Sequence, residues 1–197
     1  MNLDCSQQYI LEDERVLLRP LEWEDIEHLR HFVVEEPEIW RFSLMAINSV
    51  DDLTEYVNIA VQNRAKGLEY PFIVFDKATQ QYAGCTRFYD IQNIHSTLQL
   101  GYTWYGKNFQ GSGLNKHCKY LLLQFAFETL GAERLELRAD SKNDRSIAAM
   151  KSIGCTVEGI LRSHMLKPDG SRRNSIVLSI LKDEWISRIK ALLQTRL

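Results

Sequence analysis

The sequence predicts a mixed α/β (α+β) fold in one domain, with a mostly antiparallel sheet flanked by helices. Three observations predict this class. The 197 residues are 45% hydrophobic and 25% charged, which is ordinary for a globular chain. Segments with apolar residues at every second position alternate with segments of helical period 3.6. No linker rich in proline, glycine or serine divides the chain, so we expect one domain over residues 1–197, with a core at about 15–185.

The first half of the chain is expected to begin with a strand and two helices and to continue as a meander of three strands. Ser49 followed three residues later by Asp52 is typical of a helix N-terminus, and Gly67 can end that helix. The meander has short turns, which predicts antiparallel pairing. These elements are expected at residues 16–21, 23–33, 53–64, 70–75, 82–89 and 97–104.

The second half of the chain is expected to alternate helices and strands. A helix between the strands at 97–104 and 135–139 is a crossover, so these two strands should be parallel. Pro168-Asp169-Gly170 reads as the turn of a hairpin. The elements are expected as helix, strand, helix, two strands and helix at 114–129, 135–139, 144–153, 158–167, 172–181 and 183–197.

Charge, hydropathy and cysteine content exclude several functional classes. The formal net charge is −2, unlike that of a strongly basic nucleic-acid binder. The longest apolar stretch, residues 120–127, is far shorter than the ~20 residues of a membrane span, and no secretory signal is visible. The four cysteines form no CxxC pair. We therefore expect a cytoplasmic protein with reduced thiols, without nucleic-acid or membrane partners and without a metal.

The loop before the helix at 114–129 carries the most informative pattern. A strand leads into a loop with two glycines, Gly111 and Gly113, and a long amphipathic helix follows at once. The first N–H groups of a helix have no partner within the helix and favour anions, so this loop suits a phosphate or pyrophosphate. Lys116 adds positive charge. The P-loop and the dinucleotide-binding fingerprint GxGxxG do not fit these residues.

The segment Gln110-Gly111-Ser112-Gly113-Leu114-Asn115 resembles the Q/R-x-x-G-x-G/A motif of the GCN5-related N-acetyltransferases, the GNAT family. Asn115 stands where that motif has a small residue. The segments 17–21 and Asn143–Ser146 and the hairpin at 158–170 are similar to the RimJ/RimL-like branch, which acetylates protein N-termini and other amines. The resemblance spans about residues 15–185.

This resemblance implies that acetyl-coenzyme A is the co-substrate. The fourth predicted strand would pair with the pantetheine arm through its backbone, and one of its N–H groups could hold the thioester oxygen. The glycine loop would hold the pyrophosphate, and Asn143 would contact the pantetheine arm. The residues expected to bind the co-substrate are Tyr102, Thr103, Trp104, Gln110, Gly111, Ser112, Gly113, Leu114, Asn115, Lys116 and Asn143.

The catalytic residues are less clearly marked. Many family members carry a tyrosine that protonates the departing thiolate, but Met150 stands at that position here. The RimL-like branch has a serine three residues after the asparagine, and Ser146 matches it, so Ser146 is the candidate acid. His164 and Glu158, on the next predicted strand, are candidate bases, directly or through water.

The acceptor is expected to be a primary amine attacked in its neutral form. Deprotonating a lysine amine at pH 7 costs about 4.6 kcal/mol, whereas an α-amine costs about 1.0–1.4 kcal/mol. The sequence therefore favours a protein N-terminus or a small-molecule α-amine. A longer acyl donor, a homodimer and a non-catalytic coenzyme A sensor or scaffold of the same fold remain open.

Overall fold

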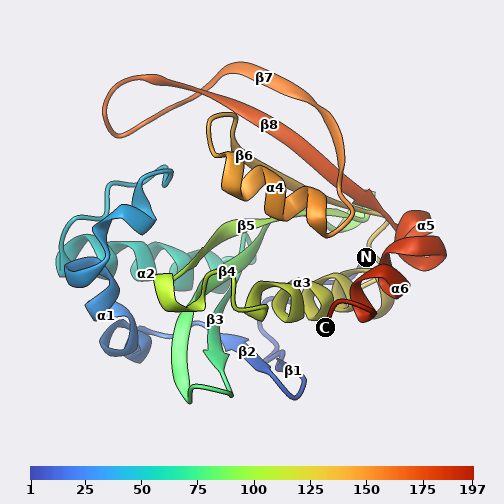
Figure 1. Ribbon diagram of the computed structural model, residues 1–197, viewed down its shortest axis with the longest axis horizontal. Helices are drawn as coiled ribbons and strands as arrows, with labels where there is room; N and C mark the ends of the chain where they lie inside the picture. Colours follow the sequence, from blue (N-terminus) through green and yellow to red (C-terminus); the bar gives the residue numbers. More distant parts are fainter.

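The backbone forms one eight-stranded sheet in a computed structural model that describes residues 1–197 (Figure 1). The strand order is β1-β2-β3-β4-β5-β6-β8-β7. Only β5 and β6 are parallel, and every other neighbouring pair is antiparallel. The strands are β1 Leu11–Glu12, β2 Val16–Pro20, β3 Tyr70–Asp76, β4 Gln81–Gln92, β5 Thr97–Tyr105, β6 Arg134–Asp140, β7 Thr156–Leu166 and β8 Arg172–Leu181.

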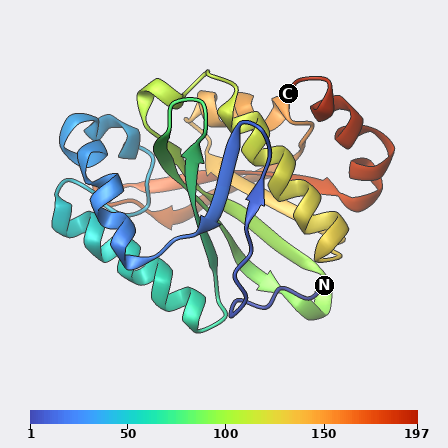
Figure 2. The same ribbon diagram turned by 90° about the horizontal axis from the view of Figure 1, so that it is seen from below.

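Helices cover both faces of this sheet (Figures 1 and 2). α1 and α2 pack on one face and α3 crosses the other, with α4 beside it. Ser49 caps α2, because its Oγ accepts the Asp52 N–H at 3.1 Å. No helix is both long enough and apolar enough to span a membrane. The helices are α1 Ile26–Glu35, α2 Val50–Ala65, α3 Leu114–Gln124, α4 Asp144–Ser152, α5 Lys182–Glu184 and α6 Lys190–Gln194.

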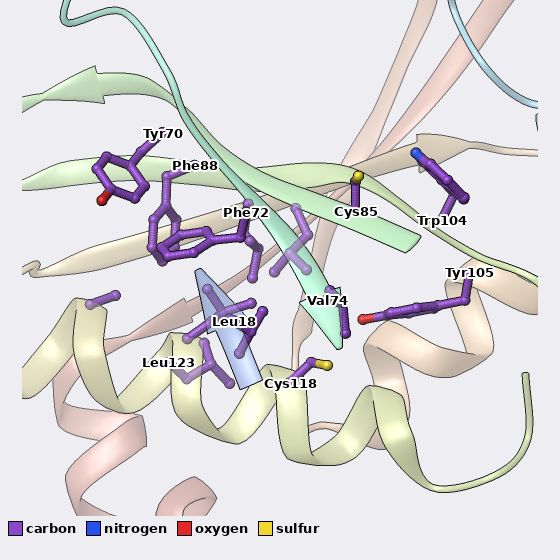
Figure 3. Close-up of a cluster of buried hydrophobic side chains, with 14 of the residues drawn as sticks. Leu18, Tyr70, Phe72, Val74, Cys85, Phe88, Trp104, Tyr105, Cys118 and Leu123 are labelled. Carbon is purple, nitrogen blue, oxygen red and sulfur yellow. The ribbon is translucent and has the colours of Figure 1, made fainter. Parts of the chain in front are cut away.

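The alternation of side chains along β3 and β4 gives the two faces of the sheet different character. Phe72 and Phe88 lie on the face covered by α3, which we call the α3 face, with ring centroids 5.9 Å apart. Figure 3 shows them in the cluster with Leu18 of β2 and Leu123 of α3. Arg87 lies on the opposite face, which we call the α2 face, because its guanidinium contacts the ring of Tyr56 in α2.

The expected single α/β fold with a mostly antiparallel sheet is confirmed, including the parallel pair. Two features of the fold were not expected from the sequence. β8 lies between β6 and β7, so the hairpin attaches to the sheet through its second strand. The helices expected at 114–129 and 183–197 both change from α to π hydrogen bonding, at Phe125–Thr129 and Trp185–Ile189.

Candidate active site

A fork between β5 and β6 opens the centre of the sheet. The two strands pair over only three residues, from Thr97 opposite Arg134 to Gln99 opposite Glu136. Both continue beyond this point, β5 to Tyr105 and β6 to Asp140, bonded to β4 and β8 on their outer sides. The inner edge of β5 therefore presents backbone groups that need hydrogen-bond partners.

A bulge in β5 lies at this fork. Gly101 pairs with Arg87 and Trp104 pairs with Cys85, so Tyr102 and Thr103 together face the single residue Thr86. Tyr102 adopts a positive φ of 49°, which is uncommon for a residue with a side chain. As a result, the Tyr102 ring points to the α2 face, where it contacts Arg87, whereas the Thr103 hydroxyl lies 2.8 Å from Thr86 Oγ1. Trp104 is buried among core aromatic rings, so its backbone alone is available to a ligand.

The glycine loop lies directly after β5. The Gln110 amide donates to the Tyr105 carbonyl at 2.6 Å and fixes the loop to the end of the strand. Gly111 and Gly113 have φ of 76° and 92°, the left-handed region that favours glycine. Ser112 Oγ donates to the Phe109 carbonyl at 2.7 Å and lies 3.4 Å from the Leu114 N–H.

The N-terminus of α3 fits an anionic group. The N–H groups of Gly111, Ser112, Gly113 and Asn115 donate to no acceptor in the protein. A Cβ built on either glycine would meet no atom within 4 Å, so the loop borders open space. Lys116 is exposed at the same end. Free N–H donors, a helix N-terminus and a lysine are the groups that a pyrophosphate requires.

A buried lysine lies beneath the bulge on the α3 face. Lys119 of α3 is 5% exposed, and its Nζ donates to Thr103 Oγ1 at 3.0 Å. Burial lowers the pKa of Lys119 to about 8, an effect that the neighbouring Cys118 and Cys155 thiols only partly oppose. The hydrogen bonds from Lys119 to Thr103 and between Thr103 and Thr86 therefore hold the bulge on the α3 face of the sheet.

The start of α4 places Asn143 and Ser146 together. Asn143 is the N-cap residue, and its Oδ1 accepts the Ser146 N–H at 3.1 Å. This bond leaves the Asn143 amide NH₂ and the Ser146 hydroxyl without protein partners. Met150 is 6% exposed and belongs to the hydrophobic core, so the position of the family tyrosine is filled by a packing residue.

The charged side chains of Arg134, Glu136 and Arg138 form a row along β6. The two candidate bases, Glu158 and His164, lie at opposite ends of this row. Arg134, in the paired part of the strands, binds Glu158 through both guanidinium nitrogens, and Ser179 Oγ donates to the same carboxylate. These contacts lower the pKa of Glu158 to about 2. Glu158 thus lies at the closed end of the fork and is a weak proton acceptor.

His164 lies at the open end of the fork. Its Nε2 is 3.4 Å from Arg138 Nη1 and its Nδ1 is 3.0 Å from the buried Ser175 Oγ. Because arginine can only donate, Nε2 is the acceptor and Nδ1–H donates to Ser175. Partial burial and the nearby charges of Arg138 and Arg173 lower the pKa of His164. The imidazole is therefore neutral at pH 7 and able to take a proton.

Comparison with known proteins identifies the family that has this architecture. The model of the acetyltransferase (GNAT) domain family matches residues 15–156, which contain the fork, the glycine loop and the start of α4. The chain belongs to the GNAT acetyltransferase family. Members of this family use acetyl-coenzyme A, whose pyrophosphate fits the free N–H groups of the glycine loop.

Relatives of this GNAT chain are distant in sequence but match it over most of their length. It is 25% identical to "Uncharacterized N-acetyltransferase p20" of Bacillus licheniformis, over 89% of this chain and 97% of that protein. Identity to the spermidine N(1)-acetyltransferase of Escherichia coli K12 is also 25%, over 92% and 94%. A solved structure from T. thermophilus, described as a "putative acetyltransferase", superimposes with a TM-score of 0.86 at 32% identity, covering 95% and 96%.

Two charged residues of this GNAT site were not predicted from sequence. Lys119 follows Cys118 and precedes Leu122 by one helical turn, and this place at the edge of the apolar stripe was the available signal. Arg173 is 8% exposed and shares the face of β8 with the buried Ser175 and Ser179. The sequence carried no signal there, because the residues that alternate with Arg173 on this face include the polar Ser175 and Ser179.

Proposed function

We propose that this GNAT acetyltransferase is RimJ/RimL-like and transfers an acetyl group from acetyl-coenzyme A directly to an α-amine. One observation carries the proposal: the fork between β5 and β6 has free backbone donors on one side and the neutral His164 on the other. The pyrophosphate would bind residues 110–116, and the pantetheine arm would pair with β5 from Gly101 to Trp104. The Asn143 amide would donate to the same arm.

In the proposed reaction the amine nitrogen forms a bond to the thioester carbon, and the carbon–sulfur bond breaks with its electron pair remaining on sulfur. His164 Nε2, once its 3.4 Å contact with Arg138 Nη1 is released, takes the proton that the amine loses, directly or through a water. The Ser146 hydroxyl, or a water that it holds, donates a proton to the sulfur. A backbone N–H at the Tyr102–Thr103 bulge would stabilise the charge that develops on the thioester oxygen. Glu158 would hold Arg134 in place.

The absence of a strongly activated base on this path favours an α-amine over a lysine. An α-amine needs about 3 kcal/mol less than a lysine to reach its neutral form at pH 7. The dependence of kcat/KM on pH tests this directly, with thiol release as the readout. For a peptide α-amine we expect kcat/KM to rise and level off near pH 8. Turnover of internal-lysine peptides but not of α-amines would contradict the proposal, as would a profile that still climbs above pH 9.

A second candidate function is a non-catalytic coenzyme A sensor or scaffold of the same fold. The buried Met150, which replaces a proton donor, is the observation that favours it. Calorimetry with acetyl-coenzyme A and single-turnover thiol release separate the two. Binding without thiol release for every amine tested would support the sensor, and any acetylated product would support the enzyme.

A further inference from the structure

The Arg173 side chain is mostly buried, and its Nε has no hydrogen-bond partner. The residue is 8% exposed, its Nε has no hydrogen-bond acceptor, and no carboxylate lies within 4.0 Å of it. Arginine keeps its charge in proteins, so this is a mostly buried cation that has no ion pair within 4.0 Å and one unused buried donor. A buried charged donor without an acceptor is unfavourable. A ligand present in the working state of the enzyme would remove this cost.

Arg173 lies near the Tyr102 bulge, at the open end of the fork. Ser175, its neighbour on the same face of β8, pairs with Asp140, the last residue of β6. Arg173 is two residues from Ser175 and therefore lies beyond the end of β6. The ionisable groups that act on it are first Asp140 and then Tyr89 and Tyr102. Tyr102 is the bulge residue at the fork, and its ring is 5.1 Å from that of Tyr89. The hairpin therefore carries Arg173 over the open end of the fork, on the α2 face.

The other charged groups of this face already have partners. Glu69 binds Arg87 at 2.6 Å, and Glu136 binds Arg138 at 2.6 Å. Asp140 accepts the Lys142 N–H at 2.9 Å and makes no ion pair with Arg173. Arg87 is held between the rings of Tyr56 and Tyr102, and its Nη2 has no acceptor. Two guanidinium groups thus retain donors beside Tyr102.

We propose that Arg173 binds the carboxylate of an acceptor that is a free α-amino acid. This inference rests on the proposed function and specifies its substrate class. A guanidinium matches a carboxylate with paired N–H donors. A carboxylate one carbon from the amine would place the amine near His164 and the Tyr102 bulge. A polyamine would bring only positive charge to this arginine, and a peptide would have an amide where the carboxylate belongs.

The test compares alanine, serine and leucine with their α-carboxamides as acceptors, in the wild type and in Arg173→Met. For each acceptor we take the ratio of kcat/KM in the wild type to kcat/KM in the variant. The different basicities of acids and amides cancel in this ratio. A hydrogen bond to a charged group is worth about 1.5–3 kcal/mol, so we expect kcat/KM for the acids to fall roughly 10- to 100-fold more than for the amides. Arg173→Lys should retain part of the discrimination, because it keeps the charge.

Arg162→Met is the matched control, because Arg162 is an exposed arginine on the same hairpin. It should show no such discrimination between acids and amides. Calorimetric binding of coenzyme A and thermal unfolding of each variant establish that the fold and the co-substrate site are intact. If kcat/KM of a folded Arg173→Met falls by the same factor for acids and amides, the arginine does not bind the carboxylate and the inference fails.

Two further measurements test other acceptors and another acyl donor. If C-terminally amidated peptides or spermidine are acetylated but free amino acids are not, the amino-acid assignment fails and the proposed acetyl transfer stands. If no amine releases thiol, the proposed function itself fails. Succinyl-coenzyme A with leucinamide tests a carboxylate on the acyl donor. A preference for this donor over acetyl-coenzyme A that disappears in Arg173→Met would overturn the assignment to the acceptor.

Discussion

Replacing the buried Lys119 by methionine should stabilise the protein at neutral pH. Burial lowers the pKa of Lys119 from 10.5 to about 8, and at about 1.4 kcal/mol per pH unit this corresponds to roughly 3 kcal/mol of unfavourable desolvation. Methionine keeps the volume without the charge. It also loses the hydrogen bond to Thr103, worth about 1 kcal/mol. The net gain in unfolding free energy at pH 7 should therefore be about 2 kcal/mol.

The sign of the pH dependence follows from the depressed pKa. Below pH 8 both folded and unfolded chains carry the Lys119 proton, so the wild type bears the whole cost. Between about pH 8 and 10.5 the folded state releases the proton first, and wild-type stability recovers relative to the variant. Urea unfolding at pH 7 and pH 9.5 measures this difference, in which the titration of the buried thiols common to both proteins largely cancels.

Lys116, exposed one turn earlier on the same helix, supplies the control. Lys116→Met should change the unfolding free energy by no more than about 0.5 kcal/mol at either pH. The reasoning would be refuted if Lys119→Met lowered stability at pH 7, or if its advantage were as large at pH 9.5 as at pH 7.

Three further predictions concern the site. Gly113→Val should abolish coenzyme A binding in calorimetry, because φ of 92° disfavours a branched side chain and the new atoms enter the open space of the loop; unchanged affinity in a folded protein would disprove the site. Ser146→Ala should lower kcat about 100-fold if the serine is the acid, and a drop below threefold would leave it a structural role. His164→Gln should lower kcat/KM at pH 7 by about 100-fold while Glu158→Gln changes thermal stability more than turnover; the reverse pattern would exchange their roles.

The sequence predicted the elements better than their arrangement. Alternation and turn residues located the seven long strands, and the crossover helix predicted the one parallel pair. The position of β8 between β6 and β7 was not predictable, because either strand of a hairpin can pair with a neighbour and the choice depends on tertiary packing. The two-residue β1 is too short to give a periodic signal.

The loop of the candidate site was predictable because its chemistry depends on local spacing. Gly111 and Gly113 are close in sequence and mark a helix start. The separation of Glu158 from His164 was not predictable, since it depends on where β5 and β6 part. The place of Lys119 at the edge of the apolar stripe was a weak sign of its burial. The burial of Arg173 was not predictable, because it depends on contacts with distant strands that the local sequence does not show.

The insertion of β8 beside β6 has a consequence for how the molecule is made. Arg134 at the start of β6 pairs with Leu181, and Asp140 at its end pairs with Ser175. A nascent chain that has emerged only through residue 168 can form the glycine loop and α4, but the edge of β6 still lacks its partner. Unpaired edges invite association with other chains. Termination or cleavage before residue 181 should therefore yield aggregates, because β8 is the strand that completes the sheet.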